Sequence, residues 1–142
     1  MRKSILLSLI ILALFSLAAC STALQVTEVD KWLSTKAGST APTISVSGEW
    51  QDSVYADNTF MGWGAGKFEQ SGSTVTGNLG LYIVKGMVSG NKLYLVLLTG
   101  GSVYYTATLE MKKENKELYG NYYYPKDKEQ TQPYPMSLKR IN

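Results

Sequence analysis

The sequence of 142 residues contains no histidine and a single cysteine, Cys20. A chain without histidine lacks the commonest general base and the commonest metal ligand. This absence excludes Ser–His and Cys–His nucleophile systems and zinc sites of the usual Cys/His type. One cysteine forms no disulfide within the chain, so an apolar core must stabilise the fold. We therefore expect no catalytic residue, no metal site and no cofactor.

The chain also lacks a strong charge of either sign. Its 14 Lys and Arg residues stand against 11 Asp and Glu, and no basic cluster suggests a nucleic-acid partner. A glycosidase needs two carboxylates facing one cleft, but Glu69 and Glu110 fall on outward strand positions, and Asp52 and Asp57 fall in a loop. The glycine-rich segment Gly62–Gly66 has neither a P-loop lysine nor a following helix. We expect a protein that is not an enzyme.

A long membrane-spanning run is missing as well. The apolar run from Ile5 to Ala19 is shorter than the roughly 20 residues of a transmembrane helix. It follows Arg2 and Lys3 and ends in small residues, as secretory signals do. The segment Leu17–Cys20, Leu-Ala-Ala-Cys, resembles the lipobox of bacterial lipoproteins. The resemblance implies a signal peptide over residues 1–19, lipidation of Cys20 and a membrane as partner. The alternative is an ordinary signal peptide with a chance cysteine.

Ser21 follows the predicted lipidated cysteine. Serine at this position, rather than aspartate, resembles the outer-membrane sorting choice of cells with two membranes. The resemblance implies a lipid-anchored protein of the cell envelope, in the outer membrane and facing the periplasm or the cell surface. Cleavage would remove Arg2 and Lys3 and leave 12 basic against 11 acidic residues, a net charge of +1.

Residues 20–42 form the predicted tether between the lipid and the folded domain. They contain a short amphipathic helix, because four apolar residues recur there at helical spacing: Val26, Val29, Trp32 and Leu33. Such a helix either packs on the domain or lies on the lipid surface, and its low positive charge favours packing. The small and polar residues 35–42 are typical of a linker.

From Thr43 onward, short apolar–polar alternations separated by turn residues predict strands. The eight predicted strands are Thr43–Trp50, Gly62–Gln70, Thr74–Gly80, Leu81–Ser89, Lys92–Leu98, Val103–Met111, Glu117–Tyr124 and Tyr134–Ile141. Closure into a barrel would bury one face of these strands and protect their edges. Sequential hairpins favour an all-β, eight-stranded antiparallel up-and-down barrel over a sandwich. The predicted barrel domain covers residues 43–142.

Alternation also predicts which side chains fill the barrel. The predicted inward residues are Trp50, Phe68, Val75, Leu79, Leu81, Leu93, Leu95, Leu97, Val103, Tyr105, Ala107, Leu109, Leu118, Tyr122, Met136 and Leu138. These side chains are mostly large, which predicts a filled interior with at most a shallow pocket at one mouth. The segment Leu93–Leu98 is apolar on both faces, and we expect the helix around Trp32 to cover its outer side.

The residues Gly48-Glu49-Trp50 resemble the G-x-W motif of lipocalins and their calycin relatives. The segment Phe68–Gly77 is similar to hairpins of small calycin-like bacterial barrels. The resemblance spans Ser47 to about Tyr124 and implies an up-and-down barrel with Trp50 plugging its closed end. The chain is shorter than lipocalins, lacks their disulfides and does not match their later motifs, so the resemblance implies no ligand specificity.

Two functional hypotheses follow from the sequence. In the first, a barrel mouth below the loop Gln51–Met61 binds a small apolar or amphipathic ligand. The residues predicted for this site are Tyr55, Phe60, Trp63, Tyr105 and Tyr122. In the second, an interaction or envelope-scaffold protein contacts another protein or a glycan through an outward tyrosine-rich sheet face. The residues predicted for that face are Tyr119, Tyr123 and Tyr134. Local aromatic packing on an ordinary sheet is the alternative to both.

Overall fold

The computed structural model describes residues 22–55, 62–112 and 114–141, so the predicted signal peptide and Cys20 lie outside the described residues. A short helical turn, η1 (Val26–Glu28), runs into helix α2 (Val29–Ala37), and eight strands follow. The strands are β1 (Gly48–Asp52), β2 (Ala65–Ser71), β3 (Thr74–Leu79), β4 (Tyr82–Ser89), β5 (Lys92–Thr99), β6 (Ser102–Lys112), β7 (Glu117–Tyr123) and β8 (Tyr134–Ile141). In this part of the chain no helix is both long and apolar enough to traverse a bilayer.

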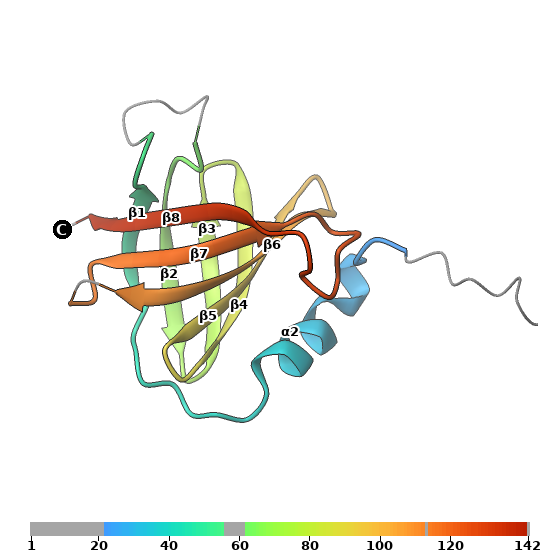
Figure 1. The fold of residues 1–142 in the computed structure, drawn as a ribbon, viewed down its shortest axis with the longest axis horizontal. Helices are drawn as coiled ribbons and strands as arrows, with labels where there is room; N and C mark the ends of the chain where they lie inside the picture. The colour runs from blue at the N-terminus through green and yellow to red at the C-terminus, as the bar shows by residue number, and fades with distance from the viewer. Residues whose placement is uncertain (1–21, 56–61, 113, 142) are drawn as a thin grey trace, which may run out of the picture.

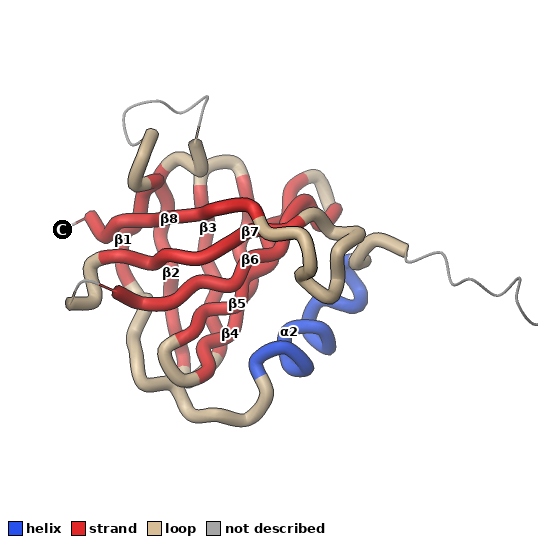
Figure 2. Tube along the Cα trace, viewed as in Figure 1, coloured by secondary structure: helices blue, strands red, loops and turns tan. Residues whose placement is uncertain are grey.

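The eight strands form one closed barrel. Each strand pairs antiparallel with the next, and β8 returns to pair antiparallel with β1. The chain winds around the barrel in sequence order, and α2 lies outside it (Figures 1 and 2). Closure pairs both edges of every strand, which protects the backbone groups of the sheet. The predicted eight-stranded up-and-down barrel, preceded by a short helix, is confirmed.

At one end of the barrel, here called the closed end, the segment before β1 crosses the end of the barrel and places Val46 in the core. The prediction of a strand over Thr43–Trp50 is wrong in its first half, because β1 begins at Gly48. Side chains replace strand partners in the crossing segment. The N–H of Val46 donates to Oε1 of Gln70 at 2.8 Å, and Nε1 of Trp50 donates to the carbonyl of Val46 at 2.8 Å.

Arg140 fastens this crossing segment to the last strand. Its guanidinium donates to the carbonyls of Ser45, at 2.9 Å, and of Ser47, while its Nε donates to the carbonyl of Asn115 at 2.9 Å. The same guanidinium lies 4.4 Å from the ring centre of Trp50, a cation–π contact. Burial lowers the pKa of Arg140. Trp50 is therefore enclosed between the core and Arg140 at the closed end.

Large side chains fill the interior between the two ends. The predicted inward residues that are buried there are Trp50, Phe68, Val75, Leu79, Leu93, Leu95, Leu97, Ala107, Leu109, Leu118, Met136 and Leu138. Val46, Val84 and Val88 complete this cluster. The prediction for Leu81 is wrong: its side chain is 90% exposed because it lies in the turn between β3 and β4.

A bulge in β6 corrects the prediction for Val103. The register between β5 and β6 shifts, so that Leu98 pairs with Val103 while Leu97 pairs with Tyr105. Tyr104 is the extra residue, and an extra residue reverses the alternation on one side of a bulge. Val103 consequently faces outward, while Tyr105 still faces the interior.

Helix α2 packs on the outer face of the barrel beside β4 and β5 (Figure 1). A second apolar cluster joins it to the sheet and consists of Leu24, Val29, Trp32, Leu33, Val96, Leu98 and Val103. This cluster explains why β5 is apolar on both faces. The prediction that the helix around Trp32 covers that strand is confirmed, and the helix packs on the barrel.

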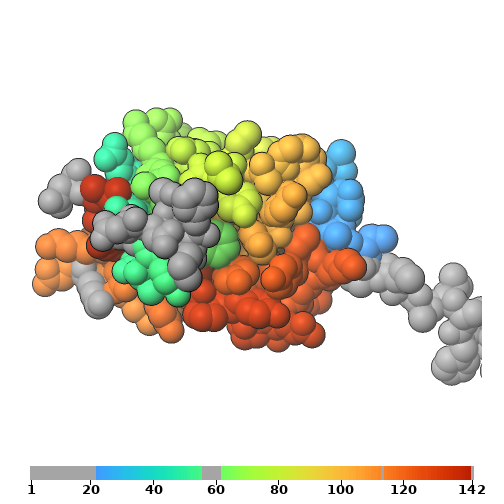
Figure 3. Space-filling model, turned by 90° about the horizontal axis from the view of Figure 1, so that it is seen from above, coloured from blue at the N-terminus to red at the C-terminus, as the bar shows by residue number. Residues whose placement is uncertain are grey.

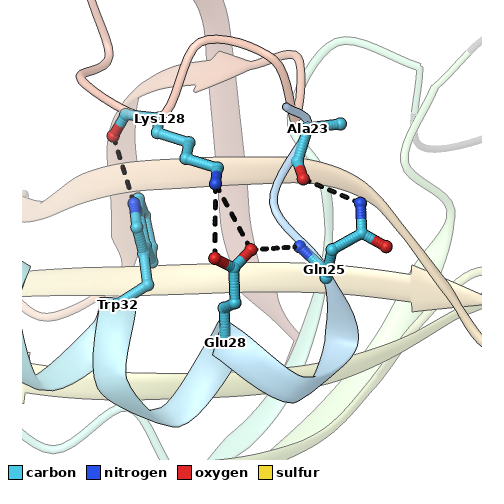
Figure 4. Close-up of polar contacts among 5 residues, drawn as sticks. All are labelled: Ala23, Gln25, Glu28, Trp32 and Lys128. Atoms are coloured by element: carbon cyan, nitrogen blue, oxygen red, sulfur yellow. Dashed lines mark hydrogen bonds and ion pairs between the residues drawn. The ribbon is translucent and has the colours of Figure 1, made fainter. Parts of the chain in front are cut away.

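The loop 125–133 also contacts the helical segment. Nε1 of Trp32 donates to the carbonyl of Lys128 at 3.1 Å, and the ammonium of Lys128 lies 3.3 Å from the carboxylate of Glu28 (Figure 4). The N–H of Gln25 donates to the same carboxylate at 2.9 Å. The hydrogen bond from Gln25 and the contact with Lys128 lower the pKa of Glu28.

Candidate functional site

The barrel end opposite Trp50 is here called the mouth. The strands β1, β3, β5 and β7 end there, and β2, β4, β6 and β8 begin there. Four aromatic rings meet above the filled core at this end. The ring centre of Trp63 lies 4.8 Å from that of Tyr122, 5.4 Å from that of Tyr105 and 6.2 Å from that of Tyr82. The contacts with Tyr105 and Tyr122 are edge-to-face, a favourable geometry for aromatic pairs.

Three more tyrosines extend this aromatic cluster to the surface. Tyr134 stacks on Tyr122 with ring centres 5.3 Å apart, and Tyr124 meets Tyr134 edge-on at 5.4 Å. Tyr104 lies 6.2 Å from Tyr82 on the other side of the mouth. The rings therefore continue from the floor of the mouth to its rim.

Asp52, the last residue of β1, fixes the backbone around the mouth. Its Oδ1 accepts hydrogen bonds from the N–H groups of Val54, at 2.8 Å, and Tyr55, at 2.7 Å. Its Oδ2 accepts one from the N–H of Trp63 at 3.0 Å. The carboxylate is buried and joins the two chain segments that lead to and from residues 56–61. Its role here is to position the backbone that carries Trp63.

Two glycines let the segment before β2 pass close to the turn between β3 and β4. Gly64 has φ +74° and Gly80 has φ +54°, a region that L side chains rarely adopt. A Cβ on Gly80 would lie 2.4 Å from the carbonyl oxygen of Trp63. This close approach brings Trp63 across the mouth.

A cavity of about 540 Å³ opens at the mouth. The described residues that line it are Asp52, Val54, Tyr55, Gly62, Trp63, Tyr82, Tyr105, Tyr119, Tyr122, Pro135, Met136 and Ser137. Met136 also belongs to the filled core, so the cavity is closed from below. Its walls combine ring faces with tyrosine hydroxyls, which offer both apolar surface and hydrogen-bonding groups.

Two tyrosines of the site have perturbed acidities. Burial is the main cause that raises the pKa of Tyr82, with smaller contributions from Tyr105 and Tyr104. Burial also raises the pKa of Tyr122, and Tyr124, Tyr105 and Tyr134 add to the effect. Both hydroxyls are therefore neutral hydrogen-bonding groups around neutral pH.

The structure brings together four of the five residues predicted for the ligand site. Tyr55, Trp63, Tyr105 and Tyr122 all line the cavity, while Phe60 lies outside the described residues. Tyr82 is a further member that the sequence analysis missed. Counting back in steps of two from the inward residues of β4 would have found it, since Tyr82 and Val84 share the inner face.

The three tyrosines predicted for a partner-binding face do not share one exposed surface. Tyr119 is 48% exposed on the outside of β7, but Tyr123 is only 8% exposed. Tyr123 pairs with Thr106, over which Gln130 folds with Nε2 3.2 Å from the threonine hydroxyl. Burial raises the pKa of Tyr123. Tyr134 belongs to the aromatic cluster of the mouth instead.

Carboxylates elsewhere on the barrel form exposed ion pairs. Glu69 lies 3.3 Å from Lys67, and Glu110 lies 3.7 Å from Lys92. Within residues 22–55, 62–112 and 114–141, no three His, Cys, Asp or Glu side chains are grouped as a metal site would require.

No protein-family model, no curated protein and no solved structure matches this chain.

Proposed function

We propose that this chain is a non-enzymatic lipoprotein of the cell envelope whose barrel mouth binds a small amphipathic molecule. The observation that carries the proposal is the cavity of about 540 Å³ at the mouth, lined by converging aromatic rings above a filled core. Its volume lies within the range of small-molecule sites, which are concave and mostly apolar with a few polar groups.

The shape of the site limits how a ligand binds. Because the core below Met136 is filled, the ligand lies across the mouth and does not enter the barrel axis. Its apolar part packs on the rings of Trp63 and Tyr105. Its polar group takes hydrogen bonds from the neutral hydroxyls of Tyr82 and Tyr122. Asp52 supports this arrangement through the backbone of Trp63.

Support for membrane anchoring comes from the sequence. Leu17–Cys20 resembles a lipobox, and the resemblance implies acylation of Cys20. Growth with an alkyne-tagged palmitate tests this part of the proposal. The chain should carry the tag, and Cys20→Ala should abolish it. An untagged chain would contradict the lipoprotein assignment without bearing on the mouth.

Titration of the mature chain with anilinonaphthalene sulfonate and with a lysophospholipid tests the mouth. We expect saturable binding that changes the fluorescence of Trp63, since this tryptophan lines the cavity while Trp32 and Trp50 do not. Tyr122→Ala should weaken binding about tenfold, the value of one lost aromatic contact of roughly 1.4 kcal/mol.

Tyr94→Ala is the matched control for the titration, because Tyr94 packs against the outer cluster under α2. It should leave the affinity unchanged. If Tyr122→Ala and Tyr94→Ala weaken binding equally, or if neither probe binds, a ligand site at the mouth is refuted.

A further inference from the structure

Most of the exposed large apolar side chains of the barrel lie toward the mouth, with Tyr119 on the outside of β7 as an exception. Leu81 and Ile83, beside the β3–β4 turn, are 90% and 64% exposed. Around them at the same end lie Val54, Tyr55, Tyr104, Tyr124 and Tyr134, all of them exposed. These seven residues are here called the rim. An exposed apolar patch of this kind marks an interaction surface.

Many charged side chains lie at the closed end, away from the rim. The closed end carries Lys92, Glu110, Lys112, Glu114, Lys116, Glu117, Lys139 and Arg140. Among the described residues toward the mouth, Asp52 is buried, exposed Lys67 lies on β2 in the same cross-strand row as Ile83, and further charges belong to loop 125–133 and its partner Glu28. That loop folds onto the outside of β6, where Gln130 bonds to Thr106 and Thr108. The seven residues of the rim are themselves uncharged.

The start of the described chain lies at the same end as the rim. The N–H of Leu24 donates to the carbonyl of Pro125 at 2.8 Å, directly after β7 ends. Residues 23–26 also border a hollow of about 220 Å³ with Gly101 and Val103 at the tip of the β5–β6 hairpin. In Figure 3 the blue N-terminal residues adjoin the orange hairpin tip and the red loop 125–133.

The short spacing between Cys20 and Leu24 restricts where the barrel can sit. Four residues span at most about 14 Å even when fully extended. If Cys20 carries acyl chains, as proposed above, the point where the chain joins the barrel is held close to the lipid surface. The closed end, with its charges, is then the end farther from the membrane.

We infer that the rim rests in the interfacial region of the membrane that holds the acyl chains, so that the mouth opens toward lipid. Tyrosine rings favour this region, because their bodies are apolar and their hydroxyls remain in contact with polar headgroups. Leu81 and Ile83 reach the boundary of the acyl chains. An amphipathic ligand then passes between bilayer and mouth without crossing open water. The inference rests on the proposed lipidation of Cys20.

The test uses the full lipidated protein reconstituted into vesicles of phosphatidylethanolamine and phosphatidylglycerol. Acylated Cys20 has no free thiol, so Leu81→Cys and Tyr104→Cys each provide one labelling site on the rim. Ser71→Cys is the matched control, because Ser71 is exposed at the closed end. Each thiol carries the fluorophore NBD, which is quenched by iodide from the water and by doxyl groups attached to lipids.

The rim labels should be several-fold less quenched by iodide than the Ser71 label, and only the rim labels should be quenched by doxyl lipids. Equal iodide quenching at all three positions in a protein that floats with the vesicles would overturn the orientation and leave the anchor intact. A protein that does not float at all would overturn both the anchor and this inference. Titration with anilinonaphthalene sulfonate and with the lysophospholipid tests the ligand site separately.

Discussion

At the scale of single residues, Asp52 connects the backbone segments on the two sides of the loop at the mouth. Its carboxylate accepts three backbone hydrogen bonds from segments that the chain separates by six residues. The sequence predicts only that Asp52 is a carboxylate in a loop. Nothing in the order of residues shows which backbone N–H groups its side chain will contact. Its neighbour Trp63, in contrast, was predictable as a large ring beside the loop Gln51–Met61.

Replacement of Asp52 should weaken the fold and the site together. Asp52→Ala leaves three N–H groups without their acceptor, and we expect the free energy of unfolding to fall by about 2–4 kcal/mol. Asp52→Asn keeps one oxygen and should cost about 1–2 kcal/mol. Urea unfolding measures both. Glu69→Gln, in an exposed ion pair, is the control and should stay within about 0.5 kcal/mol. Equal stability of all three variants would contradict the role of Asp52.

The mouth tyrosines should make stability depend on alkaline pH. The pKa values of Tyr82 and Tyr122 are raised by burial above the ordinary value of 10.0. Below that pH both folded and unfolded chains hold these protons, so the two groups give no slope. Above it the unfolded chain ionises first, and the free energy of unfolding falls as pH rises.

Urea unfolding at a series of pH values above neutrality measures this slope. The double variant Tyr82→Phe, Tyr122→Phe lacks both ionisable hydroxyls and should lose less stability between neutral and alkaline pH than the natural chain. An identical slope for the two proteins would show that the mouth tyrosines do not titrate differently in the folded state.

At the scale of elements, the strand positions were largely predictable and their irregularities were not. Turn residues and alternation placed β2 to β8 within a few residues. Alternation assumes an unbroken strand, so it missed the bulge at Tyr104 and assigned Val103 to the wrong face. It also extended β1 back to Thr43, because residues 43–47 alternate between exposed and buried or partly buried positions as a strand does, although side chains supply the hydrogen-bond partners there.

Close contact between β6 and β7 depends on Gly120. A Cβ at this position would lie 2.1 Å from the carbonyl oxygen of Thr108 on the neighbouring strand. Gly120→Ala should therefore lower the free energy of unfolding by about 1–3 kcal/mol or more, because the strands must separate. Circular dichroism during urea unfolding measures the loss.

The control for this strand contact is Gly72→Ala. Gly72 has φ +59° in the β2–β3 turn, and a Cβ added there would meet no atom within 4 Å. The substitution should cost only the conformational penalty of about 1 kcal/mol. A larger loss at Gly72 than at Gly120 would show that backbone conformation, not strand spacing, is limiting.

At the scale of the whole molecule, helix and barrel form one unit, because α2 shares its apolar cluster with β5 and β6. We expect the helix and the barrel to unfold together. Fluorine NMR of the chain labelled with fluorotryptophan follows Trp32 on the helix and Trp50 in the barrel in a single protein. Both folded signals should disappear at the same urea concentration. Earlier loss of the Trp32 signal would show that the helix detaches first.

The closure between β1 and β8 has a consequence for the order of events during synthesis. Tyr134–Ile141 pairs with both β1 and β7, and Arg140 within it fastens the chain segment that enters β1. A growing chain that has released seven strands still presents two unpaired sheet edges, which are templates for aggregation. Completion of the barrel therefore requires Tyr134–Ile141, and a chain whose synthesis stops before Tyr134 is a product suited to a chaperone or a protease.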